Sequence, residues 1–212
     1  MKDGFYQHQD ILEALRTRIC LTPPTDSFPL GEGLVAKEFN VSRTPVRQVL
    51  QTLAREHLVE IRPSVGASVV RLTPESRAQS FEVYRDLTAI AAKLAEGRPL
   101  PTAVGMEFAG IWGILSSGPE QSTDLYVSLM VRIQAALSLA VEDQIVLDAM
   151  LAAFWRMIRW RVQDIACDPN LHWERFRHNV QLANEATRMG DPSHMLRTIA
   201  GLSDRMVADS RK

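Results

Sequence analysis

The chain has 212 residues, of which 46% are hydrophobic, and its formal net charge is −1 at pH 7. This length and composition predict a substantial core in one large or two small domains and exclude disorder. The sequence has neither a long apolar run nor a signal-peptide pattern, so we predict a cytoplasmic protein with no membrane partner. The near-neutral charge excludes a protein whose whole surface is basic, so any phosphate-binding surface must be a local patch.

Helical periodicity begins near the N-terminus. Apolar residues recur at helical spacing over residues 8–20, at Ile11, Leu12, Leu15 and Ile19. The segment LTPPTDSFPLG ends this helix with three prolines. Two further helices are predicted at about 32–39 and 42–56, with Asn40 closing the first of them and a short joint between them. This is the spacing of a helix-turn-helix.

The sequence pattern changes after His57. The segment LVEIRPSVGASVVRL alternates with period two, is rich in β-branched residues and contains a Pro-Ser-Val-Gly turn, which together predict a small hairpin. Two helices followed by such a hairpin indicate a winged helix-turn-helix. We therefore predict a first domain over residues 1–73, ended by Thr73-Pro74.

Beyond Thr73 every predicted element is a helix. Breaks at GRPLP, SSGPE, CDPN and MGDP help to separate the helical patterns, which cover about 75–96, 102–116, 121–140, 142–166, 171–189 and 192–209. Residues 74–212 are thus predicted to form an all-α bundle of about six helices, and the fold class is mainly α. Cys20 and Cys167 lack metal-ligand spacing, and we expect both to be small buried hydrophobic residues.

The stretch NVSRTPVRQVL contains polar residues that packing does not explain. Ser42 suits an N-cap and Pro45 suits a first helical turn. Arg43, Thr44 and Arg47 lie at the start of the same helix, which is the end that faces base edges when a helix-turn-helix binds the major groove. Arginine can bind guanine O6 and N7 together, and the serine and threonine hydroxyls suit phosphate. The alternative is that both arginines are solvated surface charges.

Basic residues gather around this predicted helix. Between residues 37 and 71, Lys37, Arg43, Arg47, Arg55, Arg62 and Arg71 stand against Glu38, Glu56 and Glu60. Gly66 is at the hairpin tip, with arginines on both flanks, and this context favours binding to double-stranded DNA. The predicted DNA contacts are Lys37, Ser42, Arg43, Thr44, Arg47, Arg62 and Gly66.

The stretch VSRTPVRQVLQTLAREHLVEIRPSVGASVV resembles the winged helix of the GntR family of bacterial transcription regulators, whose pattern is close to VSRTPVREAL, then L, then GLV and a turn with Gly. Gln48, His57 and Val65 depart from that pattern. The predicted bundle resembles the ligand-binding (FCD-type) domain of the FadR-like branch. The resemblance implies a sequence-specific regulator controlled by a small-molecule effector. Because one small winged helix offers limited contact, we expect a homodimer on an inverted-repeat operator.

In that branch the helical domain often holds a metal through an Asp and three His. Aligning the family patterns with this chain puts Met130, Gln134, Val180 and Leu202 at the four ligand positions. These side chains are weak metal donors or none, so we predict no metal and no cofactor. A drier cavity would favour an effector with an apolar body and one anionic group, for which Arg85 is the candidate partner.

Alternatives remain for this second domain. Arg85 can equally form a surface ion pair, for instance with Glu82. The four side chains can also fill the cavity, which would leave a DNA-binding dimer without an effector. An enzyme is not favoured, because the sequence has no GxSxG, Gly-rich phosphate loop or Cys-His signature, and no catalytic residue is predicted. We expect His172, His178 and His194 at the surface or an interface, and the tryptophans in the core or a dimer face.

Overall fold

The computed structural model describes residues 3–63 and 65–210, with side-chain burial described for residues 8–63 and 65–203. Its N-terminal part, which we call the winged module, contains three helices and three short strands in the described residues. They are α1 (Asp3–Leu21), β1 (Pro29–Leu30), α2 (Glu32–Glu38), α3 (Arg43–Arg55), β2 (Val59–Arg62) and β3 (Gly66–Val69). The predicted helix-turn-helix and hairpin are therefore present.

The sheet of the winged module contains one strand that the sequence did not predict. β1 pairs with β3, which gives an antiparallel sheet in the order β1-β3-β2. Leu30 lies opposite Ala67, and Glu60 lies opposite Ser68 in the predicted hairpin. β1 has two residues, too few to show an alternating pattern, and it includes Pro29, which is tolerated because β1 is an edge strand.

Two left-handed residues mark the ends of α2 and α3. Asn40, with φ of 53°, lies in the joint between the two helices, where Val41 N–H donates to the Ala36 carbonyl at 3.0 Å. His57, with φ of 57°, follows α3, and the next N–H, that of Leu58, donates back into the helix. Histidine and asparagine adopt this conformation more readily than most residues, so the departure from glycine at His57 preserves the turn.

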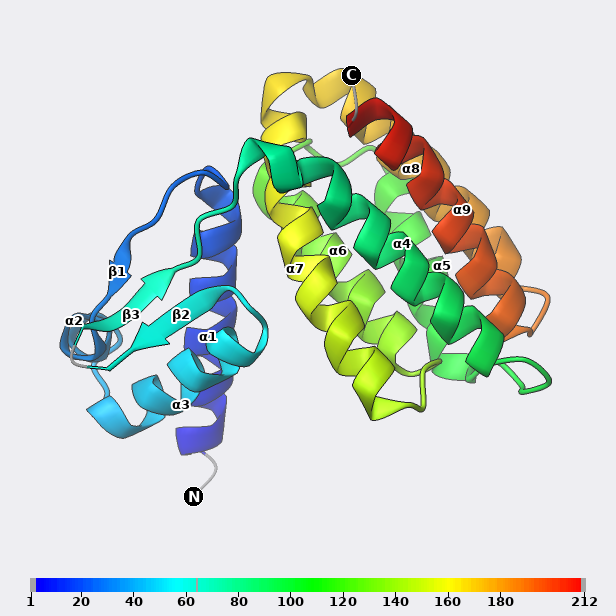
Figure 1. Ribbon diagram of the computed structural model, residues 1–212. Coiled ribbons are helices and arrows are strands. Elements are labelled where there is room, and N and C mark those ends of the chain that lie inside the picture. The colour runs from blue at the N-terminus through cyan, green and yellow to red at the C-terminus, as the bar shows by residue number, and fades with distance from the viewer. Residues whose placement is uncertain (1–2, 64, 211–212) are drawn as a thin grey trace.

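The rest of the described chain is helical and forms what we call the helical bundle. A short 3₁₀ turn, η1 (Pro74–Ser76), leads into α4 (Arg77–Leu94), α5 (Thr102–Ser116), α6 (Thr123–Ser138), α7 (Gln144–Cys167), α8 (Pro169–Thr187) and α9 (Pro192–Ser210). α4 packs against both α7 and α9, and α5 packs against α6 and α8 (Figure 1). These six helices follow the predicted ones to within a few residues, and the mainly α fold class is confirmed.

The expected burial is found at three tryptophans of the bundle but not at its cysteine. Trp155, Trp160 and Trp173 are buried, whereas Cys167 is exposed at the end of α7, contrary to our expectation. Cys20 is buried in the winged module, where burial raises the pKa of its thiol to about 12. No helix in the described residues is long and apolar enough to cross a membrane.

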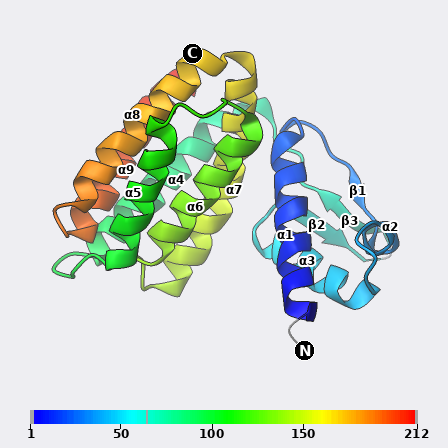
Figure 2. The same cartoon turned by 180° about the vertical axis from the view of Figure 1, so that it is seen from behind.

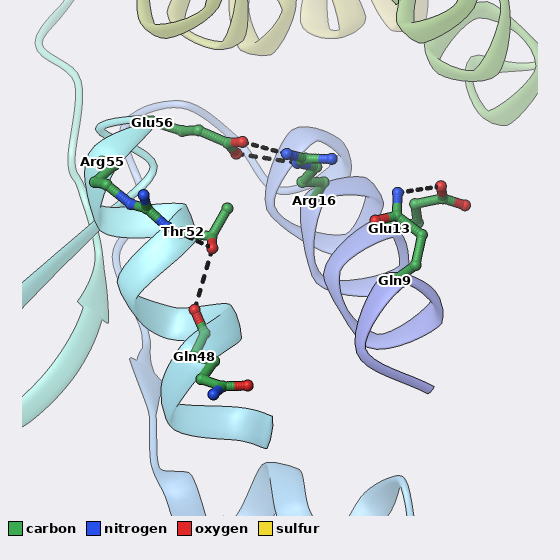
Figure 3. Close-up of polar contacts among 7 residues, drawn as sticks. All are labelled: Gln9, Glu13, Arg16, Gln48, Thr52, Arg55 and Glu56. Atoms are coloured by element: carbon green, nitrogen blue, oxygen red, sulfur yellow. Dashed lines mark hydrogen bonds and ion pairs between the residues drawn. The ribbon is translucent and has the colours of Figure 1, made fainter. Parts of the chain in front are cut away.

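The winged module and the bundle meet along α1, which lies beside α6 and α7 (Figure 2). Arg16 of α1 forms a two-bonded ion pair with Glu56 at the end of α3 (Figure 3). The Arg16 guanidinium also lies 5.1 Å from the ring centroid of Trp155 on α7. α1 is therefore held to α3 on one side and to α7 on the other.

A second contact crosses the same junction. Arg159 of α7 has 1% of its surface exposed, and its guanidinium donates to the carbonyls of Val70 at 2.5 Å and Pro24 at 3.1 Å. Burial lowers the pKa of Arg159, but arginine stays protonated in proteins, so the buried charge needs these acceptors. Both acceptors belong to segments that flank the sheet of the winged module.

Replacing Arg159 by methionine should destabilise the protein by about 1–3 kcal/mol, because the Val70 carbonyl would lose the Arg159 donor and the Pro24 carbonyl would keep only the Leu72 N–H, while the methionine still fills much of the space. Chemical denaturation followed by tryptophan fluorescence measures this loss. Arg156→Met is the matched control on the same helix, since the Arg156 guanidinium has no hydrogen-bond partner in the described chain, and it should change stability by less than about 0.5 kcal/mol. Equal losses in the two variants would contradict this role.

Candidate DNA-binding surface and bundle cavity

The seven predicted DNA contacts are all exposed and lie on α2, at the start of α3 and in the β2–β3 hairpin. These elements are on the side of the winged module that faces away from the bundle (Figure 1). The orientation of α3 follows from its apolar face, since Val46, Val49, Leu50 and Leu53 are buried. Arg43, Thr44 and Arg47 are consequently directed to solvent at the N-terminal end of α3.

Two of the three arginines of α3, Arg43 and Arg47, lie against the first turn of α2. Arg47 forms a two-bonded ion pair with Glu32, at 2.9 Å from Nε and 3.0 Å from Nη2. A Cβ atom added at Gly33 would lie 3.5 Å from Nη2 of Arg43. The hydrogen bond from Arg47 lowers the pKa of the Glu32 carboxyl, which is therefore ionised at neutral pH. This pair uses two of the five guanidinium N–H groups of Arg47 and leaves three for another acceptor.

The sequence analysis did not identify Glu32 as part of this surface. It is 15 residues from Arg47, and only the packing of α2 on α3 brings the two side chains together. Because the Arg47 side chain is 64% exposed, the pair adds little to stability. Its effect is to restrict the directions that the guanidinium can take.

The remaining predicted contacts differ in their surroundings. Ser42 occupies the N-cap position of α3, but its side chain makes no capping hydrogen bond, which corrects that part of the sequence interpretation. Arg62 pairs with Glu60 at 2.9 Å on the exposed face of β2. Gly66 has φ of 102° and open space around it, so the turn requires glycine for its backbone conformation rather than for close packing.

A cavity of about 70 Å³ lies inside the helical bundle and has a mainly apolar lining. Its walls are Tyr84, Phe108, Tyr126, Met130, Ile133, Met157, Arg161, Phe176, Asn179, Val180, Ala183, Ile199, Leu202 and Ser203. Met130, Val180 and Leu202, which the sequence predicted to meet, are therefore brought together. Gln134 is buried beside them, and its Oε1 accepts a hydrogen bond from the Tyr84 hydroxyl at 3.0 Å, but it does not line the cavity.

Arg85 lies outside this lining. Its Nε donates to Asp86 at 2.7 Å, and its side chain is 27% exposed. The charged residue in the lining is instead Arg161 of α7, which the sequence analysis did not identify. The sequence did contain a sign that Arg161 is buried. It lies with Arg156 and Arg159 inside the apolar stretch FWRMIRWRV, and a charged residue on a buried helix face needs a partner.

The cavity does not fit a transition metal. Its described lining contains no carboxylate, imidazole or thiolate, and the side chains at the four positions aligned with family ligands are Met130, Gln134, Val180 and Leu202. Gln134 offers an amide oxygen, but that oxygen already accepts a hydrogen bond from Tyr84. Across the described residues no group of three His, Cys, Asp or Glu side chains is close enough to hold a metal.

Comparison with known proteins identifies the winged module. Residues 7–69 match the family model of the bacterial regulatory proteins of the gntR family. An HTH-type transcriptional regulator in an unstable DNA locus of Streptomyces ambofaciens is 36% identical over 102 residues, 48% of this chain and 43% of that protein. The gluconate operon transcriptional repressor of Bacillus subtilis (strain 168) is 41% identical over 69 residues, 32% of this chain and 28% of that protein.

The matched segments thus span less than half of either relative. Solved structures extend the likeness to the whole fold. E. coli McbR/YncC superposes with a TM-score of 0.70 at 15% identity over 97% of both chains. A transcriptional regulator GntR of Rhodococcus sp. RHA1 gives 0.59 at 15% identity over 97% of this chain and 98% of that chain. Residues 7–69 therefore resemble the winged helix-turn-helix of the gntR family, and the chain as a whole shares the fold of these two structures.

Protein purified without chelators should contain less than about 0.1 equivalent of zinc, nickel or manganese per chain, because the cavity lining lacks the donors that these ions require. Elemental analysis measures the metal content, and a melting curve with and without EDTA provides the control. One tightly held ion per chain, with a melting temperature that falls when EDTA is added, would show that a metal site exists in spite of this lining.

Proposed function

We propose that the protein is a sequence-specific DNA-binding transcription regulator of the gntR family, with a DNA-binding domain over residues 1–73 and an effector-binding and dimerising domain over residues 74–212. The observation that carries this proposal is the exposure of Arg43 and Arg47 at the N-terminal end of α3, within a segment that matches the gntR family. In a helix-turn-helix this end of the second helix faces the base edges of the major groove.

The chemistry of the exposed residues supports two kinds of DNA contact, to base edges and to phosphates. Arg43 and Arg47 are the candidates for bidentate contacts to guanine, and the Glu32 carboxylate holds Arg47 in a defined direction. Lys37, Arg62 and the hydroxyls of Ser42 and Thr44 are the candidates for phosphate contacts. The hairpin turn at Gly66 would then approach the DNA backbone beside α3.

Control by a small molecule is the second part of the proposal. The cavity in the bundle supports it, because the lining is mainly apolar and contains a buried cation, as expected for a ligand with an apolar body and an anionic group. The alternative is a DNA-binding dimer whose cavity takes no ligand. The small volume of about 70 Å³ is the observation that favours this alternative.

Arg43→Ala and Arg47→Ala should each weaken binding to the best DNA site by roughly tenfold to hundredfold while changing binding to unrelated DNA much less, because contacts to base edges are lost. Fluorescence anisotropy with a selected site and a scrambled site measures both affinities. Lys37→Ala and Arg62→Ala are the matched controls, and each should weaken both sites alike and lower the salt dependence by about one charge. If the arginine variants also weaken both sites alike, Arg43 and Arg47 contact only phosphate.

The protein should form a homodimer through its helical bundle and select an inverted repeat, because a twofold dimer presents two copies of α3 to two half-sites. Light scattering at micromolar concentration measures the mass with and without DNA. Deleting one half-site from the DNA should lower the affinity sharply. Inserting five base pairs between the half-sites should lower it similarly, because the insertion turns one half-site to the opposite side of the duplex. A monomeric mass in both conditions, with a non-palindromic site, would contradict this prediction.

A further inference from the structure

We propose that a cleft between the winged module and the helical bundle binds an organic phosphate monoester, whose phosphate group is received by Arg71 and Arg156. We call it the junction cleft. It is separate from the bundle cavity, and none of the seven predicted DNA contacts lines it. Binding at the junction cleft is therefore a function additional to DNA recognition, and it does not rest on the proposed function.

The junction cleft lies where the two parts of the protein face each other. The winged module contributes the end of α3, β2 and the segment that follows β3, and the bundle contributes α7. The turn between α3 and β2 is on the side of the winged module that faces the bundle, whereas the N-terminal end of α3 points away from it (Figure 1). The volume of the cleft is about 620 Å³, within the range of about 300–1,000 Å³ of small-molecule sites.

Two arginines of the lining have no acceptor. Arg71 is exposed and Arg156 is half-buried, and neither guanidinium forms a hydrogen bond or an ion pair within the described residues. Each guanidinium presents five N–H groups in a planar fork that matches two oxygens of a phosphate. Because Arg71 follows β3 and Arg156 belongs to α7, an anion that both arginines contact would touch both parts of the protein.

The side chains of the lining carry excess positive charge. The carboxylate found among the described lining residues is that of Glu60, and it is neutralised by Arg62 in an ion pair at 2.9 Å. The charges of Arg71 and Arg156 are not balanced in this way. A phosphate monoester carries a charge of about −1.5 to −2 at pH 7, which matches two guanidinium groups better than a monocarboxylate does.

His57 adds a hydrogen-bonding group that the turn itself does not require. Its φ of 57° is a conformation that glycine adopts without cost, so the backbone does not account for an imidazole at this position. The side chain is exposed in the lining, has no partner within the described chain, and can donate a ring N–H to a phosphate oxygen. The hydroxyls of Thr73 and Ser76 already donate to the Glu75 side chain and the Thr73 carbonyl.

The size of the junction cleft indicates that the phosphate belongs to a larger molecule. A cavity of about 150 Å³ is enough for benzene, so inorganic phosphate would fill only a small part of this cleft. Apolar surface lies in the same lining, where Ile61 is 47% exposed and Ala54 is half-buried. The sugar or base of a sugar phosphate or a nucleoside monophosphate would occupy this part.

The ligand would lie beside a contact that already joins the two parts. Val70 lines the junction cleft, and its carbonyl accepts the hydrogen bond from Arg159. Arg156 is three residues before Arg159 on α7, so the two side chains are neighbours along the helix. A phosphate held by Arg71 and Arg156 would add a second link across the same junction and would stabilise the arrangement in which the two parts are joined.

The experiment titrates the full-length protein, without DNA, with AMP, glucose 6-phosphate and inorganic phosphate. Adenosine and glucose are the matched compounds without a phosphate, and sodium chloride holds the ionic strength constant. Calorimetry gives the affinity and thermal unfolding gives the stabilisation. We expect at least one of the two esters to raise the melting temperature in a saturable way and to bind about tenfold more tightly than its uncharged counterpart and than inorganic phosphate.

Three results of these titrations overturn the inference. The first is no saturable binding of either ester. The second is equal binding of each ester and its uncharged counterpart, which would show that the phosphate is not recognised. The third is binding of inorganic phosphate as tight as that of the esters, which would show that the organic part is not recognised.

Four variants locate the binding site. Arg71→Gln and Arg156→Gln should each weaken ester binding by about tenfold, whereas Arg177→Gln, an exposed position of α8 outside the cleft, should leave it unchanged. These three variants should fold, because none of the three guanidinium groups has a partner within the described residues. His57→Gly keeps the turn and should weaken binding by about threefold, since one donor is lost. Undiminished binding in both Arg71→Gln and Arg156→Gln overturns the inference.

A short duplex of unrelated sequence distinguishes a free phosphate ester from the phosphates of a DNA backbone. Arg71→Gln and Arg156→Gln should leave the affinity for this duplex unchanged, because the junction cleft faces the bundle and the predicted DNA contacts face away from it. If these variants weaken duplex binding as much as ester binding, Arg71 and Arg156 contact the DNA backbone and the inference is overturned.

Discussion

The arrangement of this protein depends on a buried arginine that cannot give up its charge. Arg159 is almost completely enclosed, and the acceptors of its guanidinium are the backbone carbonyls of Pro24 and Val70. These carbonyls belong to the winged module, whereas Arg159 belongs to the bundle. Separating the two parts would remove both acceptors of the Arg159 guanidinium and the Arg159 donor of the Val70 carbonyl, and water would have to replace them; the Pro24 carbonyl would keep the Leu72 N–H. The Arg16 contacts with Glu56 and Trp155 reinforce the same junction, so that α3 is held with its N-terminal end away from the bundle.

One helix links this junction to the cavity. α7 contributes Trp155 and Arg159 to the contact with the winged module, and it contributes Met157 and Arg161 to the cavity lining. A second link runs through Asp164, which contacts Arg161 and also pairs with Arg77 at the start of α4, directly after the segment that leaves β3. Arg161 in the cavity lining is therefore two contacts away, through Asp164 and Arg77, from the connection between the two parts.

Most of the fold could be predicted from the sequence because helices and the hairpin have local patterns. The bundle helices appeared as apolar periodicity between clear Pro and Gly breaks, and the joint between α2 and α3 appeared at Asn40. β1 could not be predicted, because two residues carry no pattern and its pairing with β3 is a long-range contact. Cys167 was misjudged because its position in the last turn of α7, where the helix leaves the core, depends on packing rather than on residue type.

Some residues of the two candidate sites could be predicted from the sequence and others could not. The exposed positions at the start of α3 followed from helix phase, and Met130, Val180 and Leu202, which the alignment with the family patterns selected, line one cavity. Glu32 and Arg161 could not be found from spacing. Glu32 reaches Arg47 only through the packing of two helices, and Arg161 differs from Arg156 and Arg159 only in the side of α7 on which it lies.

Selection of binding sites from random duplex DNA by the full-length protein tests the central claim most directly. The account predicts that a short inverted repeat with guanine at a fixed position in each half is enriched, and that the Arg43→Ala, Arg47→Ala double variant no longer enriches it. Recovery of DNA by the unaltered protein without any enriched sequence would contradict the assignment of α3 as an element that reads bases.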